Sequence, residues 1–145
     1  MTNQICSKRT PLYEEHISLN ARMVPFGGWE MPLQYEGILK EYEQTRKAAA
    51  LFDISHMGIF KFEGPDALPF LEQLVCNQVE KSLVNKMVYG MILNHDGMIL
   101  DDIMVGFLDG AFYMIVNAGN RDKIWSWCQS GHWITFNETN TSDNC

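Results

Sequence analysis

Residues 87–118, MVYGMILNHDGMILDDIMVGFLDGAFYMIVNA, contain three apolar runs separated by two Asp-Gly pairs. Asp-Gly between apolar runs is a strong signal for a β-hairpin turn. The stretch therefore predicts three consecutive antiparallel strands, at residues 87–94, 98–108 and 111–118. The middle strand carries two adjacent acids, Asp101 and Asp102, among apolar neighbours.

The segments on either side of these strands predict an α+β domain over residues 55–137. HMGIFKFEG alternates as a strand does, and Gly64-Pro65-Asp66 begins a helix whose apolar stripe continues to Asn77. A second helix is expected at 120–130 and a last strand at 133–137. The order strand, helix, three strands, helix, strand is similar to a ferredoxin-like split βαβ unit with an elaborated central hairpin.

Residues 1–54 predict an N-terminal helical segment of an incomplete first domain. Helices are expected at 11–20 and 36–50, and the two prolines and the Gly-Gly pair within 22–35 predict a rigid loop between them. This part offers no strand partner of its own, so we expect it to expose Phe26, Trp29 and Met31. The last residues, 138–145, are expected to form a polar tail.

The composition excludes several classes of function. The chain has 145 residues, and its 11 basic and 18 acidic residues give a net charge of −7. This balance argues against nucleic acid and against an anionic membrane surface as partners, because both favour basic patches. No apolar run approaches the roughly 18 residues of a membrane-spanning helix. The four cysteines lack zinc-site spacing, so we expect no metal site and reduced thiols in a cytosolic protein.

The paired acids leave two interpretations open. Alternation along the strand places Asp101 and Asp102 on opposite faces, and both faces are apolar. A carboxylate in such surroundings must find hydrogen bonds or take up a proton. Either Asp101 bonds backbone amides near the end of the hairpin while Asp102 lies on an exposed rim, or one acid is a general base or ligand anchor. By pattern alone Tyr89, Asn117 and His56 are more typical of structural residues.

Six segments in order resemble the aminomethyltransferase family, the T-protein of the glycine cleavage system. The resemblance extends from about Lys8 to about Trp127, and it rests on RTPLYEEH (9–16), ARMVPFGGWEMPLQY (21–35), LFDISHMG (51–58), GPDALPFLEQL (64–74), ILDD (99–102) and IVNAGNRDK (115–123). It implies the three-domain folate-binding fold of that family, with a ferredoxin-like middle domain and a first domain completed by later chain.

The resemblance also implies a reaction and a site. The methylene of the aminomethyl group carried on the lipoyl arm of the H-protein would pass to tetrahydrofolate, with release of ammonia. Asp102 matches the catalytic carboxylate and is expected to face a folate pocket, while Asp101 is expected to brace the hairpin. Further folate contacts carry over to Met57, Tyr89, Asn117 and, through its backbone, Val116. The expected location is the cytoplasm, or the mitochondrial matrix after removal of a presequence.

The chain departs from the family pattern in three ways. Met98 stands where the family has a second turn glycine, which predicts strain if that position needs a positive φ. Gly106 stands where the family has a tyrosine beside the folate. Family members are also well over twice this length, so we expect the folate cavity to be incomplete unless a separate chain supplies the C-terminal half. The alternatives are a non-catalytic folate-binding or protein-interaction module, and a truncation product without function.

Overall fold

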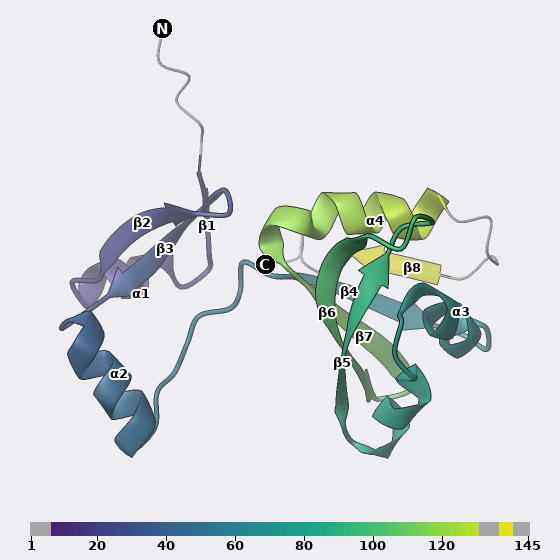
Figure 1. Ribbon diagram of the computed structural model, residues 1–145. Helices are drawn as coiled ribbons and strands as arrows, with labels where there is room; N and C mark the ends of the chain where they lie inside the picture. Colours follow the sequence, from purple (N-terminus) through teal and green to yellow (C-terminus); the bar gives the residue numbers. More distant parts are fainter. Residues whose placement is uncertain (1–6, 131–136, 141–145) are drawn as a thin grey trace, which may run out of the picture. The chain divides into compact units, whose positions relative to one another are not determined.

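The computed structural model describes residues 7–130 and 137–140 (Figure 1). The chain divides into two compact units, one ending at His56 and the other beginning at Met57. We call their described residues the first unit and the second unit. Within these residues no helix is long and apolar enough to span a membrane.

The second unit is a five-stranded antiparallel sheet with helices between its strands. In sheet order the strands are β5-β6-β7-β4-β8. In chain order the elements are β4 (Gly58–Glu63), α3 (Ala67–Leu74), the 3-10 helix η1 (Val79–Val84), β5 (Met87–Leu93), β6 (Ile99–Leu108), β7 (Ala111–Val116), the short 3-10 helix η2 (Ala118–Asn120), α4 (Arg121–Ser130) and β8 (Asn137–Asn140).

This topology confirms an α+β fold but does not confirm the ferredoxin-like description. Strands β7 and β8 are both antiparallel to β4, which lies between them, so β7-α4-β8 forms one split βαβ unit. Strands β4 and β5 are separated by β6 and β7 and run in opposite directions. A ferredoxin-like unit has two strands between its helices, whereas three lie between α3 and α4, and the odd number reverses β5.

The predicted three-strand meander is confirmed, and its turns have the expected chemistry. Asp109 and Gly110 both have positive φ, 50° and 83°, as a two-residue hairpin turn requires. In the β5–β6 turn Gly97 has φ 77°, and the Asn94 side chain accepts hydrogen bonds from the backbone N–H groups of Asp96 and Met98. Met98 is not among the residues with positive φ, so the strain suggested there is not found.

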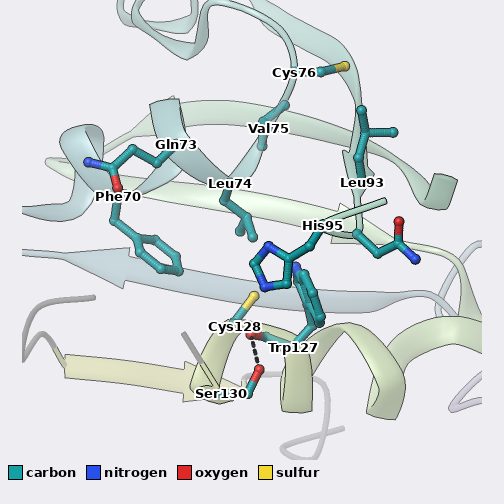
Figure 2. Close-up of a pocket in the computed structure, with 11 residues that line it drawn as sticks. Phe70, Gln73, Leu74, Val75, Cys76, Leu93, His95, Trp127, Cys128 and Ser130 are labelled. Atoms are coloured by element: carbon teal, nitrogen blue, oxygen red, sulfur yellow. Dashed lines mark hydrogen bonds between the residues drawn. The ribbon is translucent and has the colours of Figure 1, made fainter. Parts of the chain in front are cut away.

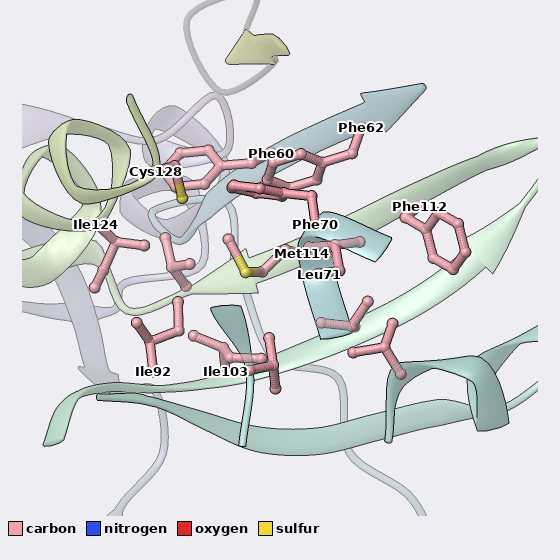
Figure 3. Packing of buried hydrophobic residues seen from close by; sticks show 14 of the residues in the cluster. Phe60, Phe62, Phe70, Leu71, Ile92, Ile103, Phe112, Met114, Ile124 and Cys128 are labelled. Atoms are coloured by element: carbon pink, nitrogen blue, oxygen red, sulfur yellow. The ribbon is translucent and has the colours of Figure 1, made fainter. Parts of the chain in front are cut away.

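One face of the sheet carries α3, η1 and α4. The hydrophobic core lies between this face and the three helices (Figure 3). Alternate residues of each strand enter this core, as the period of two requires. The ring of Trp125 on α4 packs on Phe60 with centroids 5.0 Å apart. The fully buried large side chains of the sheet and helices include Phe60, Phe62, Leu71, Ile92, Ile103, Met114 and Ile124. The opposite face carries Asp102 together with Tyr89, Met91, Met104 and Ile115, and we call it the Asp102 face.

The first unit contains a second, small sheet that the sequence did not predict. Its elements are β1 (Lys8–Arg9), α1 (Tyr13–Ser18), β2 (Arg22–Phe26), β3 (Trp29–Gln34) and α2 (Ile38–Lys47), with the strands ordered β1-β3-β2. The rigid loop predicted at 22–35 is therefore wrong, as is the expected lack of a strand partner. Gly27 and Gly28 have φ 57° and 86° and turn β2 back onto β3 as a hairpin.

The prolines that suggested a loop lie where a strand tolerates them. Pro25 is on the edge strand β2. Strand β1 pairs with Trp29 and Glu30, and among the residues that the structure describes β3 has no second strand partner beyond those two. Pro32 lies in this part of β3. Its missing N–H therefore costs no hydrogen bond on the edge of β3 that faces β1. Of the expected exposed residues, Phe26 is 62% exposed, Trp29 is half-buried and Met31 is buried, so the expectation for Met31 was wrong.

The described residues include only part of the C-terminal segment for which a strand and a polar tail were predicted. Residues 133–136 of the predicted last strand lie outside the described residues, and β8 instead covers Asn137–Asn140, within the part expected to be a polar tail. Cys76 and Cys128 are free thiols, while Cys6 and Cys145 lie outside the described residues. The domain boundaries predicted from the sequence stay predictions.

Candidate functional site

Three of the predicted site residues lie on or directly beside neighbouring strands of the sheet. Asp102 on β6 pairs with Met91 on β5. The register of β6 and β7, in which Met104 faces Ile115, places Asn117 opposite Asp102 when continued by two residues. The register of β4 and β7, in which Gly58 faces Val116, places Met57 opposite Asn117 when continued by one. Asn117 and Asp102 are therefore neighbours, joined by a hydrogen bond, and Met57 directly precedes β4, the strand next to β7 in the sheet.

Asp101 is the buried member of the acidic pair. Its side chain points to the helix-covered face, and the residue is 3% exposed. It accepts hydrogen bonds from the backbone N–H of Asn117 at 3.0 Å, the Asn117 side-chain amide at 3.0 Å and the Asn120 side-chain amide at 2.5 Å. The carboxylate thus ties β6 to the chain between β7 and α4. The predicted bracing role is found, but it acts on the β7–α4 junction and not on the β5–β6 turn.

Asp102 is exposed on the Asp102 face and is held by two neighbours. The Asn117 amide donates to its Oδ1 at 2.8 Å and to its backbone oxygen at 3.1 Å, and the Tyr89 hydroxyl donates to its Oδ2 at 3.3 Å. The negative charge of Asp102, with lesser contributions from burial and this hydrogen bond, raises the pKa of Tyr89. Asn117 thus bonds both acids at once and fixes their relative orientation.

A β-bulge lies directly beside the acids. Ile92 pairs with Asp101 and Leu93 with Ile99, so Leu100 is the extra residue on β6. Its carbonyl accepts a hydrogen bond from Lys123 Nζ at 2.6 Å, which ties the bulge to α4. Bulges bend strands and re-aim side chains, and they are common beside functional sites. Sequence reasoning missed Asn120 and Lys123, although both lie in the segment IVNAGNRDK that carried the family resemblance.

The remaining predicted positions have different surroundings. The Val116 side chain is fully buried in the core, and its backbone lies in the ladder with Gly58. Gly106 is on the Asp102 face, and the thioether of Met87 occupies the space where a side chain at this position would begin. A tyrosine there would have to displace Met87. His56 is half-buried against the ring of Phe26, and burial lowers its pKa despite the nearby charge of Asp53.

Two of the hollows among the described residues are well formed, and neither includes Asp102. In the second unit a hollow of about 460 Å³ lies on the helix side of the sheet, where the rings of His95 and Trp127 are 5.1 Å apart (Figure 2). In the first unit a hollow of about 340 Å³ lies among β3, α2 and residues 49–53. The concave pocket expected around Asp102 is therefore not formed by either. Among the described residues, no group of three or more His, Cys, Asp or Glu side chains is arranged to hold a metal ion.

The chain belongs to the GCVT N-terminal domain family, whose profile matches residues 12–145. It is 47% identical over 121 residues to an aminomethyltransferase of Symbiobacterium thermophilum, covering 83% of this chain and 32% of that protein. An aminomethyltransferase of Deinococcus deserti is 43% identical over 148 residues, covering 98% of this chain and 40% of that protein.

The fold is similar to a solved structure of the same family. The crystal structure of the glycine cleavage system aminomethyltransferase T from Bartonella henselae matches with a TM-score of 0.79 and 34% identity. The match covers 91% of this chain and 38% of that one. The resemblance to the N-terminal part of T-proteins is thereby confirmed. The chain spans about a third of the length of the curated relatives it matches.

Proposed function

We propose that this chain supplies the Asp102 site of an aminomethyltransferase of the glycine cleavage system. The reaction would take the methylene of the aminomethyl group from the lipoyl arm of the H-protein, pass it to tetrahydrofolate and release ammonia. The observation that supports this most directly is the hydrogen bond by which the Asn117 amide orients the exposed carboxylate of Asp102. The relatives that this chain matches are named aminomethyltransferases.

The geometry of Asp102 suits work on an amine. Asn117 and Tyr89 each bond one carboxylate oxygen, so further lone pairs remain available on the exposed side. Tetrahydrofolate would supply the nitrogen nucleophile. A carboxylate held in this way accepts a hydrogen bond from an N–H and stabilises positive charge that develops on the nitrogen. Tyr89, with its raised pKa, keeps its proton and continues to donate to Asp102.

The floor beside Asp102 fits a planar, partly apolar ligand. Met91 pairs with Asp102 across β5 and β6, and Met104 lies two residues along β6 on the same face. Tyr89 is 54% exposed on this face and presents a ring as well as a hydroxyl. Met57 and the backbone of Val116 would complete the contacts that the family resemblance suggests. These residues supply one wall for the ligand, with Asp102 as its polar anchor.

Further polypeptide would be needed to close the site. Asp102 is exposed, and the chain spans about a third of its relatives, so the opposite wall would come from sequence beyond these residues or from a separate chain. The same observations support a second candidate function, a folate-binding or protein-interaction module without catalysis. Gly106, where the family has a tyrosine, favours this alternative because it leaves Met87 at the expected pocket wall.

The test is reconstitution. The chain is mixed with the remaining two thirds of the Symbiobacterium thermophilum relative and with aminomethyl-loaded H-protein, and ammonia and methylenetetrahydrofolate are measured. Asp102→Asn should lower turnover by about 10²–10⁴-fold, the usual contribution of a positioned acid or base. Asp109→Asn is the matched control, because Asp109 is an exposed acid in a turn and asparagine tolerates its positive φ.

The outcomes separate the two candidate functions. Turnover that depends on Asp102 supports the transferase. Turnover that Asp102→Asn leaves unchanged contradicts the catalytic assignment. Tetrahydrofolate binding by calorimetry without any turnover supports the binding module instead.

A further inference from the structure

The first unit is held together by a polar network and has almost no hydrophobic core. Among its described residues Met31 is the single buried hydrophobic side chain, whereas Thr10 and His16 are buried polar residues. Large apolar side chains such as Leu51 and Phe52 are 98% and 69% exposed. The hydrophobic contribution that usually stabilises a fold is therefore small here, and buried hydrogen bonds carry more of the structure.

The network joins four parts of the sequence. Three of them meet at the carboxylate of Asp53, and the fourth reaches it through His16. Asp53 Oδ2 accepts a hydrogen bond from Thr10 Oγ1 at 2.7 Å and lies 2.9 Å from His16 Nε2. Asp53 Oδ1 accepts a bond from the backbone N–H of Ser55 at 2.9 Å. The hydroxyl of Tyr35, which follows β3, lies 2.9 Å from the other imidazole nitrogen, Nδ1 of His16. The side chains of His16 and Asp53 are only 6% and 2% exposed.

The positions of the hydrogens in this network are assigned from the protonation states of Asp53 and Tyr35, which lie on either side of His16. Burial alone would raise the pKa of Asp53, but the hydrogen bonds from His16, Ser55 and Thr10 outweigh it and lower the pKa, so the carboxylate is ionised and only accepts. Burial and the charges of Asp53 and Glu41 raise the pKa of Tyr35, so its hydroxyl keeps its proton. We assign the hydrogens with Tyr35 donating to Nδ1 and a proton on Nε2 donating to Asp53, an arrangement that meets both contacts.

A hydroxyl, an imidazole and a carboxylate in this order also describe an activated nucleophile. Activation requires a hydroxyl that loses its proton readily, and a raised pKa for Tyr35 is the opposite condition. Ser55 and Thr10 also engage Asp53, so the carboxylate serves as a joint between segments. The arrangement therefore suits holding the chain in place better than it suits covalent chemistry.

The network holds residues 49–56, the last segment of the first unit. Residues 49–54 form neither helix nor strand, and Leu51, Phe52 and Ile54 are exposed. Asp53 is the residue of this segment whose side chain is buried. Its partners Thr10 and His16 lie 43 and 37 residues away in sequence. Two residues after the bonded amide of Ser55 comes Met57, a member of the proposed folate site.

We infer that Thr10, His16, Tyr35 and Asp53 form a latch that fixes residues 49–56, and that His16 is its positioning residue because it joins Asp53 to Tyr35. The segment that the latch holds ends directly before Met57 in the sequence. Its effect on catalysis rests on the proposed function, whereas its effect on the segment does not.

The test uses Tyr35→Phe, which removes one hydroxyl and leaves the fold's shape intact. Tyr42→Phe is the matched control, because Tyr42 is 61% exposed on α2. In the intact chain, nitrogen-15 NMR should place a proton on Nε2 of His16, and Tyr35→Phe should shift the balance of protons between the two ring nitrogens. The Ser55 amide should exchange about fivefold faster in Tyr35→Phe, the effect of losing one hydrogen bond of ordinary strength. Asp53→Asn should accelerate it further.

The outcomes keep the latch and the proposed function apart. A His16 ring without a proton on Nε2, or Ser55 exchange unchanged in Tyr35→Phe, overturns the latch whatever the activity. In the reconstituted transferase, Tyr35→Phe should raise KM for tetrahydrofolate several-fold and leave kcat nearly unchanged, since Met57 contacts ligand and not the reacting atoms. An unchanged KM overturns the positioning role. Failure of Asp102→Asn to lower turnover contradicts the proposed function and leaves the NMR and exchange results standing.

Discussion

The two adjacent acids of β6 should respond in opposite ways to truncation. Asp101→Ala removes the acceptor for three hydrogen bonds at 3.0, 3.0 and 2.5 Å from a residue that is 3% exposed. Each buried donor left without a partner costs about 1–3 kcal/mol. The side-chain amides of Asn117 and Asn120 can turn to other acceptors, but the backbone N–H of Asn117 cannot. We therefore expect Asp101→Ala to lower the free energy of unfolding by about 3 kcal/mol.

Asp102→Ala is the matched substitution one residue along. Asp102 is exposed, and after its removal Asn117 still bonds Asp101. We expect a loss of less than about 1 kcal/mol, as for most surface substitutions. The same pair of variants should separate in the reconstitution assay, where Asp102→Ala lowers turnover in folded protein.

Urea unfolding gives the measurement, followed through the NMR methyl signals of Ile103 and Met114, which are buried in the second unit and report on it alone. For a unit of this size, 3 kcal/mol corresponds to a fall in Tm of roughly 10–20 °C. Equal losses for Asp101→Ala and Asp102→Ala, or no loss for Asp101→Ala, would refute the assignment of one acid to structure and the other to the site.

Three further predictions follow from single positions. Gly58→Ala should destabilise the second unit by about 1–3 kcal/mol in urea unfolding, because a Cβ there would lie 2.7 Å from a methyl carbon of Val116. An unchanged free energy of unfolding would mean that β4 and β7 move apart there at no cost. Asp102→Asn should lower the pKa of Tyr89 in an NMR titration, because removing the negative charge favours the phenolate; an unchanged pKa would show that the charge is not its cause. The pKa of Asp53 is lowered in the folded chain, so its contribution to stability is present above about pH 4 and is lost as the pH falls further. Asp53→Asn should flatten this acid dependence when unfolding of the first unit is followed by circular dichroism, and an identical pH profile would contradict it.

Local signals predicted the second unit well and the first unit poorly. The meander was predicted because Asp-Gly turns and alternating apolar residues act within a few residues of each other. The hairpin of β2 and β3 was missed because its prolines and glycines have the composition of a loop. Whether they form strands depends on which edge each proline faces, and only the pairing with β1 shows that. The ferredoxin-like description was not confirmed because the order of strands in a sheet depends on contacts between distant segments.

The candidate site divides in the same way. The sequence by itself determined that two acids lie on opposite faces of one strand, that turns flank them and that the surrounding segments resemble a family. It did not determine which acid is buried, because both faces of the strand are apolar in sequence. Only the tertiary structure decided this: α3 and α4 pack on one face, which buries Asp101 among the donors of Asn117 and Asn120 and leaves Asp102 exposed on the other. A side chain's partners are set by elements that arrive from far along the chain, and no local pattern carries that information.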